Sequence, residues 1–375
     1  MKILIITFTG GVNPGTFMQA LGVQTALRKI YPEADIEYLK FPDFKKGKLM
    51  GHGKNASIWH IFLQKGYAAY RLLKYNRLRK HHFNYTQSID LFNYPDTATE
   101  WLKQYDLVVI GSDTILEQAY NERGKIGLNW MPFDVTKVYF AASASPANFM
   151  AHKDLKGIVE NAKFIGLRDD LSIRFFEEKL GVSSEYLVKQ PDPSYFLDIS
   201  KYKLSNRLRL KLKPREKYVL YNFNSGFTYR KVLADSLRVL GYKVISTAYN
   251  PYADICFDTI DAYEWAGVFP LIDLVVTERF HDSVFALRNC KPIIAIDWEK
   301  NRFGSEGDSK TYRILEDYGH EHLHFNLYNR DNIDSIIDTI RNISELYDKL
   351  KIQKVNVNLI EMNNNILKLL DSIIK

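Results

Sequence analysis

Short runs of apolar residues alternate with segments of helical spacing in the first half of the chain. The first run, residues 3–6, leads into a glycine-rich segment, residues 9–15, and then into apolar residues spaced as on one face of a helix. Further short apolar runs end in small or polar residues, at positions 36–39, 107–110, 138–142 and 164–167. Because buried parallel strands consist of continuous apolar runs, this pattern predicts a parallel sheet with helices between its strands.

A second series of the same kind follows residues 198–217, a stretch rich in lysine and arginine that we interpret as a linker. Strands are predicted at 218–222, 243–246, 274–277 and 292–296, and helices at 230–240, 262–269 and 282–289. The sequence therefore predicts an α/β protein with two Rossmann-like, doubly wound domains facing a cleft, at residues 1–200 and 215–350, and a C-terminal helix at 351–375. Doubly wound sheets bind ligands at the carboxyl ends of their strands, so we expect the functional site between the domains.

Length and composition agree with two domains of ordinary size. The chain has 375 residues, of which 46% are hydrophobic and 25% charged, and chains beyond roughly 250 to 300 residues divide into domains. No apolar run is long enough to cross a bilayer, and the run at the N-terminus is too short for a secretory signal, so we expect a cytoplasmic protein. With two cysteines, Cys256 and Cys290, the sequence excludes a disulfide framework.

Positive charge is concentrated in residues 44–89. This segment has ten Lys or Arg and no Asp or Glu; subtracting it from the totals of 51 and 44 leaves 41 basic and 44 acidic residues elsewhere. Residues 57–80 are predicted to form a helix whose apolar stripe comprises Ile58, Ile61, Phe62, Ala69, Leu72 and Leu73.

Two interpretations of this basic helix remain open. In one, it makes peripheral contact with the anionic inner face of a membrane or holds a lipid-diphosphate-linked acceptor sugar. In the other, its apolar stripe packs on the first domain and its charges are solvated. No nucleic-acid recognition motif accompanies the charge, so we expect no nucleic-acid partner.

Four sequence landmarks occur in a fixed order and together resemble the polysaccharide pyruvyl transferase family. The first is an Asn-Pro-Gly segment followed by a Gln-Ala helix, the second is Val-Ile-Gly-Ser-Asp, the third combines three short motifs, and the fourth contains Thr-Glu-Arg-Phe-His. They lie at residues 13–24, at 109–113, at 139–143, 166–169 and 191–194, and at 276–292.

The resemblance implies an architecture like that of GT-B glycosyltransferases and a transferase of exopolysaccharide biosynthesis. Such an enzyme moves a pyruvyl group from phosphoenolpyruvate to a sugar of a polysaccharide or of its lipid-linked precursor. Two positions depart from the family pattern: Asp113 is followed by Thr-Ile-Leu-Glu and not by Trp and Asn, and Asp282 stands where glycine is common. An acidic side chain beside the donor site would repel a phosphate unless it is turned away.

Donor binding and protonation need cations and an acid. Arg168 and Arg279 each follow a predicted strand, and a guanidinium pairs well with carboxylate or phosphate oxygens, so both are candidates for donor binding, together with Ser283. A surface ion pair at the start of the next helix is the alternative for Arg168. His281 is the candidate general acid because imidazole titrates near neutral pH, and a capping or core histidine is its alternative.

Acceptor binding needs groups that orient hydroxyls. Asp113 is the candidate to orient a hydroxyl or accept its proton, and the other candidates are Asn13, Gly15, Ser112 and Ser143. A tight turn is the alternative role of the first two, and helix capping is that of the Ser-Asp pair.

Asp192 lies between two prolines and precedes no predicted helix, so it either assists the acceptor or fixes a turn. The adjacent His81 and His82 cannot converge on one ion, and no carboxylate lies near them. We therefore expect a metal-independent site with no cofactor beyond phosphoenolpyruvate as co-substrate.

Two other functions fit the sequence. A GT-B glycosyltransferase would use a nucleotide sugar and would need a carboxylate for the ribose, a role that Glu278 could fill. A non-catalytic family member would have lost its donor site at Thr114–Glu117 and Asp282, although Arg279 and His281 argue against that loss.

Overall fold

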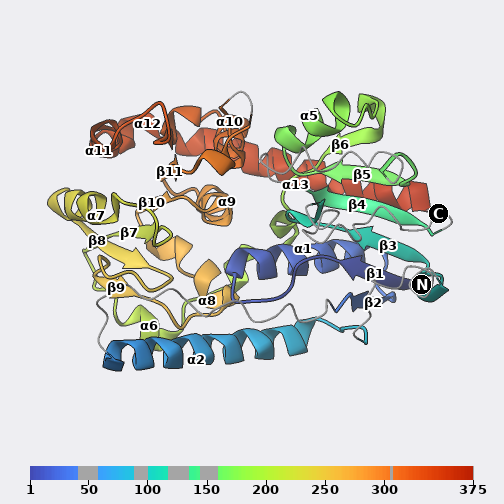
Figure 1. The fold of residues 1–375 in the computed structure, drawn as a ribbon, viewed down its shortest axis with the longest axis horizontal. Coiled ribbons are helices and arrows are strands. Elements are labelled where there is room, and N and C mark those ends of the chain that lie inside the picture. The colour runs from blue at the N-terminus through green and yellow to red at the C-terminus, as the bar shows by residue number, and fades with distance from the viewer. Residues whose placement is uncertain (41–57, 88–99, 117–134, 144–158, 305–306, 375) are drawn as a thin grey trace.

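A computed structural model of the chain describes residues 1–40, 58–87, 100–116, 135–143, 159–304 and 307–374. Figure 1 shows two sheets, one from each half of the chain, with helices around them. The prediction of an α/β fold with two parallel sheets is confirmed.

All pairs in the first sheet are parallel, and the strand order is β2-β1-β3-β4-β5-β6. Its strands are β1 (Lys2–Ile6), β2 (Asp35–Tyr38), β3 (Leu107–Ile110), β4 (Lys137–Ala142), β5 (Phe164–Leu167) and β6 (Leu187–Lys189). The order reverses between β1 and β3, so the loops after these two strands flank the crevice where doubly wound sheets bind ligands.

The second sheet is also parallel, with the order β12-β11-β10-β7-β8-β9. Its strands are β7 (Lys217–Asn222), β8 (Tyr242–Ser246), β9 (Ile255–Cys256), β10 (Leu274–Thr277), β11 (Ile293–Asp297) and β12 (His324–Asn326). Counted within this half, the order is that of the Rossmann fold, and the reversal lies between β7 and β10.

Helices cover both sheets. The α-helices are α1 (Pro14–Ile30), α2 (Ile58–His82), α5 (Asp170–Glu178), α6 (Asn206–Arg209), α7 (Arg230–Val239), α8 (Ala262–Ala266), α9 (Phe280–Arg288), α10 (Lys310–Asp317), α11 (Ile333–Arg341), α12 (Ile343–Leu346) and α13 (Lys349–Ile374). Short 3₁₀ helices lie at Ser184–Tyr186, Pro193–Phe196, Ile199–Lys201, Phe269–Leu271, Lys300–Arg302 and Glu321–Leu323.

The long helix α13 joins the two halves. It contacts α9 of the second half and both α1 and the 3₁₀ helix Pro193–Phe196 of the first, and Figure 1 shows it passing behind α10 and the first sheet. The domain boundaries stay predictions.

The helix α2 runs below both halves at the lower edge of Figure 1 and turns a different face inward from the one its pattern suggests. Arg71 is 8% exposed and donates to the Val12 carbonyl of the first half and the Thr247 carbonyl of the second, both at 3.2 Å. Leu72 and Leu73, from the predicted apolar stripe, are 43% and 65% exposed. The interpretation that this stripe packs on the first domain is therefore wrong for these two leucines. The inward face carries Arg71, which donates to two loop carbonyls, and Leu72 and Leu73 lie outside that face.

The helix α1 starts at the mouth of the crevice because its first residues suit a helix N-terminus. Asn13 caps it by accepting from the Gly15 and Thr16 amides, at 3.0 and 3.4 Å, and Pro14 occupies the first turn, where no N–H is needed. Further along, Gly22 packs so closely on the 3₁₀ helix that a Cβ there would lie 2.2 Å from the Pro193 carbonyl oxygen.

We predict that Gly22→Ala destabilises the protein by about 1–3 kcal/mol, because backbone must move to admit the methyl group. Urea unfolding of the wild type and the variant measures the difference. Gly66→Ala is the matched control: it also lies in a helix, no atom lies within 4 Å of the place that a Cβ would occupy there, and it should be neutral or stabilising by up to ~1 kcal/mol. Equal losses in both variants would contradict the packing explanation.

Candidate functional site

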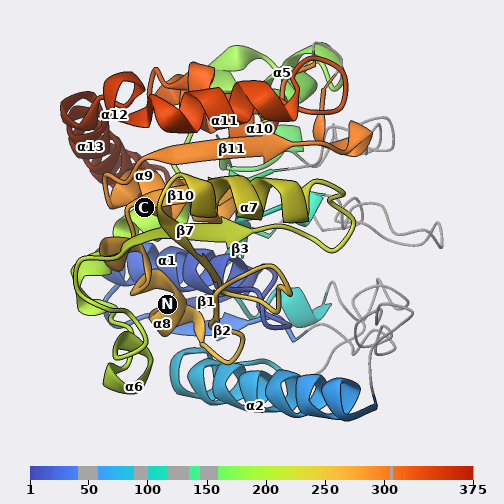
Figure 2. The same cartoon turned by 90° about the vertical axis from the view of Figure 1, so that its left-hand side faces the viewer.

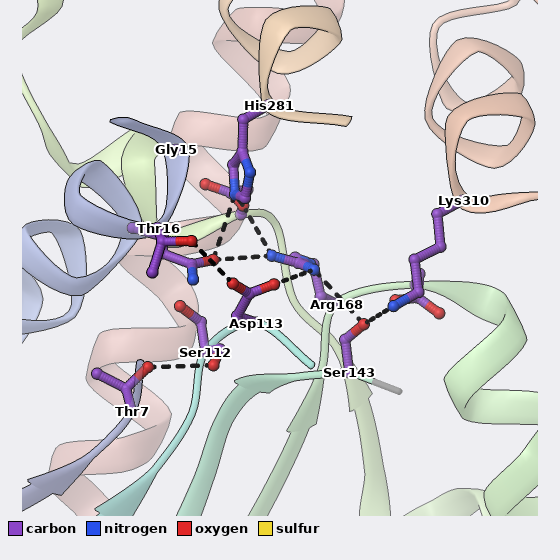
Figure 3. Close-up of polar contacts among 12 residues, drawn as sticks. Thr7, Gly15, Thr16, Ser112, Asp113, Ser143, Arg168, His281 and Lys310 are labelled. Carbon is purple, nitrogen blue, oxygen red and sulfur yellow. Dashed lines mark hydrogen bonds and ion pairs between the residues drawn. The ribbon is translucent and has the colours of Figure 1, made fainter. Parts of the chain in front are cut away.

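The loops after β1, β3, β4 and β5 meet the start of α9 at the junction of the two halves. Figure 3 shows the side chains that gather there, with Arg168 at the centre, His281 entering from the second half and Lys310 approaching from α10. The points where the strand order reverses in the two sheets therefore face each other across one site.

The guanidinium of Arg168 lies between two carboxylates. Nη2 is 3.5 Å from Asp113 Oδ1, and Nη1 is 3.3 Å from Asp192 Oδ2. Nη1 also donates to Gln19 Oε1 at 3.0 Å, and the ring of Phe280 lies 4.7 Å from the guanidinium carbon. Because these groups are largely removed from water, an unpaired charge here would be costly, and the arginine balances both carboxylates.

His281 crosses from the second half to the first. Its Nε2 is 3.3 Å from Gln19 Oε1 and 3.6 Å from Asp192 Oδ2. The ring packs on Gly15 so closely that a Cβ at position 15 would fall 2.2 Å from His281 Cγ and 2.4 Å from Nδ1. A side chain at position 15 would displace the imidazole, so glycine is required there by the approach of the other half.

Asp113 and Asp192 remain ionised because the cations around them outweigh the effect of burial. Burial on its own raises the pKa of Asp113, but the charges of Arg168, His281 and Lys310 outweigh it and the net pKa is lowered. For Asp192, burial is likewise outweighed by the hydrogen bond and charge of His281 and by Arg168, and its pKa falls well below the usual range of a carboxyl group. Both side chains are therefore weak bases and strong partners for cations.

A cleft of about 550 Å³ borders His281 at the junction of the two halves. Three arginines line it, Arg71 from α2, Arg279 before α9 and Arg302 after β11. No side chain caps the N-terminus of α9, whose first turn borders the same space. Arginines and an uncapped helix N-terminus both favour an anion.

A smaller cavity of about 180 Å³ also borders His281. Asp113, Arg168 and Lys310 line it, and Lys310 Nζ donates to Ser143 Oγ at 2.6 Å. His281 thus lines both the arginine-lined cleft and the cavity that contains Asp113, and Arg302 lines both as well.

The structure brings most of the predicted site residues together. Those that line one of the two cavities or contact its side chains are Asn13, Gly15, Asp113, Ser143, Arg168, Arg279 and His281. Ser112 and Ser283 are fully buried and line neither cavity: the first accepts from Thr7 Oγ1 through its carbonyl, and the second donates to the Arg279 carbonyl.

Two sequence interpretations are wrong in detail. Asp192 does precede a helix, the 3₁₀ helix Pro193–Phe196, and it caps that helix through the Ser194 amide at 2.9 Å. A three- or four-residue helix leaves too short a pattern to recognise. The alternative that Arg168 forms a surface ion pair at the start of α5 is also wrong, since Arg168 is 7% exposed and Asp170 pairs with Lys189 instead.

Sequence reasoning missed three polar side chains of the site. Gln19 lies in the predicted first helix but received no role, although it contacts both Arg168 and His281. Lys310 and Arg302 follow β11, in a region where the sequence shows no motif. A glutamine in the middle of an apolar helical stripe, fully buried in the structure, was the one signal available.

Asp282, which departs from the family pattern, lines the 550 Å³ cleft, but its carboxylate is taken up by hydrogen bonds to neighbouring side chains. Its Oδ2 accepts from Asn222 and Thr277 at 2.8 and 2.9 Å, and its Oδ1 accepts from Trp265 Nε1 at 3.1 Å. The carboxylate is 2% exposed and its hydrogen bonds hold it toward β7 and β10.

Both carboxylate oxygens of Glu278 also accept hydrogen bonds within the protein. One carboxylate oxygen accepts from the Asn224 amide and the other from Trp298 Nε1. Burial raises the pKa of Glu278 in spite of these hydrogen bonds. The side chain is 1% exposed and borders neither cavity, so it does not present a carboxylate to a ribose.

Within the described ranges, no group of three or more His, Cys, Asp or Glu side chains is arranged to hold a metal ion. No helix in the described part of the chain is both long and apolar enough to span a bilayer. The expectation of a metal-independent site stays a prediction.

Comparisons with known proteins identify both a family and a fold. The family model described as polysaccharide pyruvyl transferase matches residues 13–301. UDP-GlcNAc 2-epimerase from Neisseria meningitidis bound to UDP-GlcNAc superposes with a TM-score of 0.60 at 10% identity, over 96% of this chain and 99% of that one. A putative UDP-N-acetylglucosamine 2-epimerase from Listeria monocytogenes gives 0.55 at 10% identity, over 94% and 90%.

The epimerase of Methanocaldococcus jannaschii, in complex with UDP-GlcNAc and UDP, gives a TM-score of 0.53 at 9% identity over 92% of each chain. At such low identities these likenesses concern the fold alone, and they confirm the GT-B-like arrangement of two α/β domains. A search of curated proteins finds no match to this chain.

We predict that Asp192→Asn costs ~3 kcal/mol of stability at neutral pH, because it removes one partner of a buried ion pair. The pKa of Asp192 is lowered on folding, so its contribution is present above the unfolded pKa of about 4 and is lost as the pH falls toward the folded value. The difference between wild type and variant should therefore shrink from about pH 5 downward.

Urea unfolding at a series of pH values measures this difference. Asp338→Asn, in an exposed ion pair on α11, is the control and should change stability by less than ~1 kcal/mol at every pH. A deficit in Asp192→Asn that does not depend on pH would contradict the assignment.

Proposed function

Because the chain belongs to the polysaccharide pyruvyl transferase family, we propose that it transfers a pyruvyl group from phosphoenolpyruvate to hydroxyls of a sugar in a cell-surface polysaccharide or its lipid-linked precursor. The observation that carries the proposal is that His281 lines both an arginine-lined cleft and a cavity that contains a carboxylate. A residue that gives a proton to an anionic donor while a hydroxyl attacks that donor must be within reach of both substrates.

We assign the larger cleft to phosphoenolpyruvate. Its carboxylate and phosphate need several cations, and Arg279 and Arg302 lie on the cleft wall beside the uncapped N-terminus of α9. Arg168 is already paired with two carboxylates, so we give it the role of holding Asp113 and Asp192 in place.

His281 then acts as the general acid. Asp192 and Gln19 engage Nε2, and no partner for Nδ1 lies among the described residues. In the imidazolium form, Nδ1–H is the proton that passes to the methylene carbon of phosphoenolpyruvate, and the Asp192 carboxylate stabilises the charged ring before transfer.

Protonation of the methylene carbon leaves positive charge on the central carbon, which a sugar hydroxyl attacks. As the new C–O bond forms, the hydroxyl passes its proton to the now neutral imidazole of His281 and restores the acid. A second hydroxyl can then displace phosphate, which takes up that hydroxyl's proton as it leaves, and complete a ketal. Since Asp113 has a lowered pKa, we propose that it orients a hydroxyl by accepting its hydrogen bond and does not retain the proton.

A nucleotide-sugar glycosyltransferase is the second candidate, because the solved structures with this fold include enzymes bound to UDP-GlcNAc. The buried and fully hydrogen-bonded Glu278 weighs against it, since it was the carboxylate proposed for the ribose. A non-catalytic role is disfavoured by Arg279 and His281, which both border the cleft.

We predict that phosphoenolpyruvate raises the thermal stability of the wild type and that Arg279→Ala abolishes the shift. A ligand present at a hundred times its dissociation constant raises the free energy of unfolding by about 2.7 kcal/mol. Differential scanning fluorimetry with phosphoenolpyruvate, inorganic phosphate and UDP-GlcNAc measures the effect, and Arg341→Ala, which removes an exposed arginine on α11, is the control. Stabilisation by UDP-GlcNAc alone would overturn pyruvyl transfer in favour of glycosyl transfer.

We predict that His281→Gln lowers kcat by roughly 10²–10⁴-fold, the usual contribution of general acid catalysis, while phosphoenolpyruvate still binds. Phosphate release measures the rate, with surface polysaccharide of the source cells, freed of pyruvyl groups by mild acid, as the acceptor. A rate close to that of the wild type would exclude His281 as the acid.

Asp192→Asn distinguishes positioning from a merely structural role in the same assay. The carboxylate of Asp192 lies 3.6 Å from His281 Nε2. Because the variant weakens this orienting contact and leaves the arginine-lined cleft unchanged, kcat should fall by about tenfold or more while the KM for phosphoenolpyruvate stays within about twofold of wild type. A kcat close to that of the wild type would mean that Asp192 does not act through His281.

A further inference from the structure

The outward face of α2 presents apolar and basic side chains and no acidic ones. Tyr70 and Leu73 are 51% and 65% exposed, and Arg77 and Lys80, which follow at helical spacing, are partly or fully exposed as well. These four residues, spaced three, four and three apart, form one stripe, which we call the outer stripe of α2. In Figures 1 and 2 α2 forms the outermost layer at one edge of the molecule.

The inward face of the same helix uses its basic side chains for internal contacts. Arg71 donates to two loop carbonyls, Lys74 pairs with Glu264 and Asp261, and Arg79 donates to the Thr9 carbonyl at 3.3 Å. The same face also buries Tyr75 fully in the core. The helix is therefore fixed to both halves by polar contacts and by one buried aromatic ring, and the outer stripe takes no part in that attachment.

We propose that the outer stripe of α2 docks on an anionic lipid surface. Tyrosine and leucine side chains suit the boundary between headgroups and acyl chains, and lysine and arginine beside them are attracted to anionic lipids. Between Lys65 and His82, α2 carries basic residues and no Asp or Glu, so no charge on the helix opposes that approach. A second copy of the chain is a poorer occupant, because two outer stripes would bring like charges together.

Docking through α2 would also set the position of the cleft. Arg71 lies on the same helix as the outer stripe and lines the 550 Å³ cleft. One wall of the cleft is therefore the helix that rests on the lipid, and a sugar held near the membrane by a lipid anchor would enter along that wall. The docking itself does not depend on which donor or acceptor the cleft takes.

Co-sedimentation of the full chain with vesicles tests the proposal without any substrate. The wild type should bind vesicles of phosphatidylglycerol and phosphatidylcholine, and should bind pure phosphatidylcholine vesicles much less. Raising the salt from ~0.1 M to ~1 M shortens the screening length from about 10 to 3 Å and should weaken the binding. Arg77→Glu with Lys80→Glu, and separately Tyr70→Ser with Leu73→Ser, should each reduce the partition coefficient by at least about tenfold.

Matched controls lie on α13, which is well separated from α2 in Figures 1 and 2. Lys354→Glu with Lys368→Glu makes the same change of charge at exposed positions, and Leu350→Ser with Val357→Ser removes exposed apolar side chains. Both should leave vesicle binding within about twofold of wild type, and circular dichroism confirms that every variant is folded.

Absence of binding to anionic vesicles at low salt would overturn the proposal, as would equal losses in the α2 and α13 variants. Equal binding to soluble poly-glutamate, insensitive to Tyr70→Ser with Leu73→Ser, would indicate a general polyanion surface and would also overturn it. None of these results bears on phosphoenolpyruvate binding, so the docking and the transfer reaction fail or succeed separately.

Discussion

The balance of one guanidinium against two carboxylates underlies the whole site. Arg168, Asp113 and Asp192 are carried by three separate loops of the first sheet, and each would be costly to bury without the others. The arginine sets the distance between the carboxylates, and one carboxylate in turn meets the histidine of the second half. Fold and chemistry are therefore connected through electrostatics as much as through packing.

The two reversals of strand order explain why these loops meet. In each sheet the chain leaves the central pair of strands in opposite directions, and the ends of that pair are left uncovered by a crossover. When the two sheets face each other, the uncovered ends form a single space. The GT-B-like arrangement thus provides the location, and the particular side chains decide what binds there.

The central strands and the edge strand β2 could be predicted from the sequence because they are mostly apolar runs, and the other three edge strands could not. Strands β6, β9 and β12 have two or three residues each, too few to form a recognisable pattern. The predicted site residues that the structure brings together lie at the ends of central strands or in the motifs between them. Gln19, Arg302 and Lys310 reach the site through tertiary structure, and no local spacing in the sequence reveals that.

The orientation of α2 was beyond prediction for a related reason. A hydrophobic stripe predicts an inward face only when burial of that face is the main stabilising contribution. Here carbonyl groups of Val12 and Thr247 need donors, and Arg71 satisfies both at the junction of the two halves. The same face buries the ring of Tyr75 in the core. Hydrogen bonds to loops that are distant in sequence therefore act together with burial of this ring in orienting the helix.

The contact of Gly15 with the ring of His281 has a consequence for how such a protein can change over evolution. Neither domain alone holds the imidazole of His281 in a defined position, since the ring belongs to one domain and the surface that receives it to the other. An exchange of either domain for that of a distant relative would preserve the fold but would also have to preserve the absence of a side chain at position 15. Inheritance of the site is therefore tied to the fit between the domains, and a hydrogen atom at one α-carbon is part of that fit.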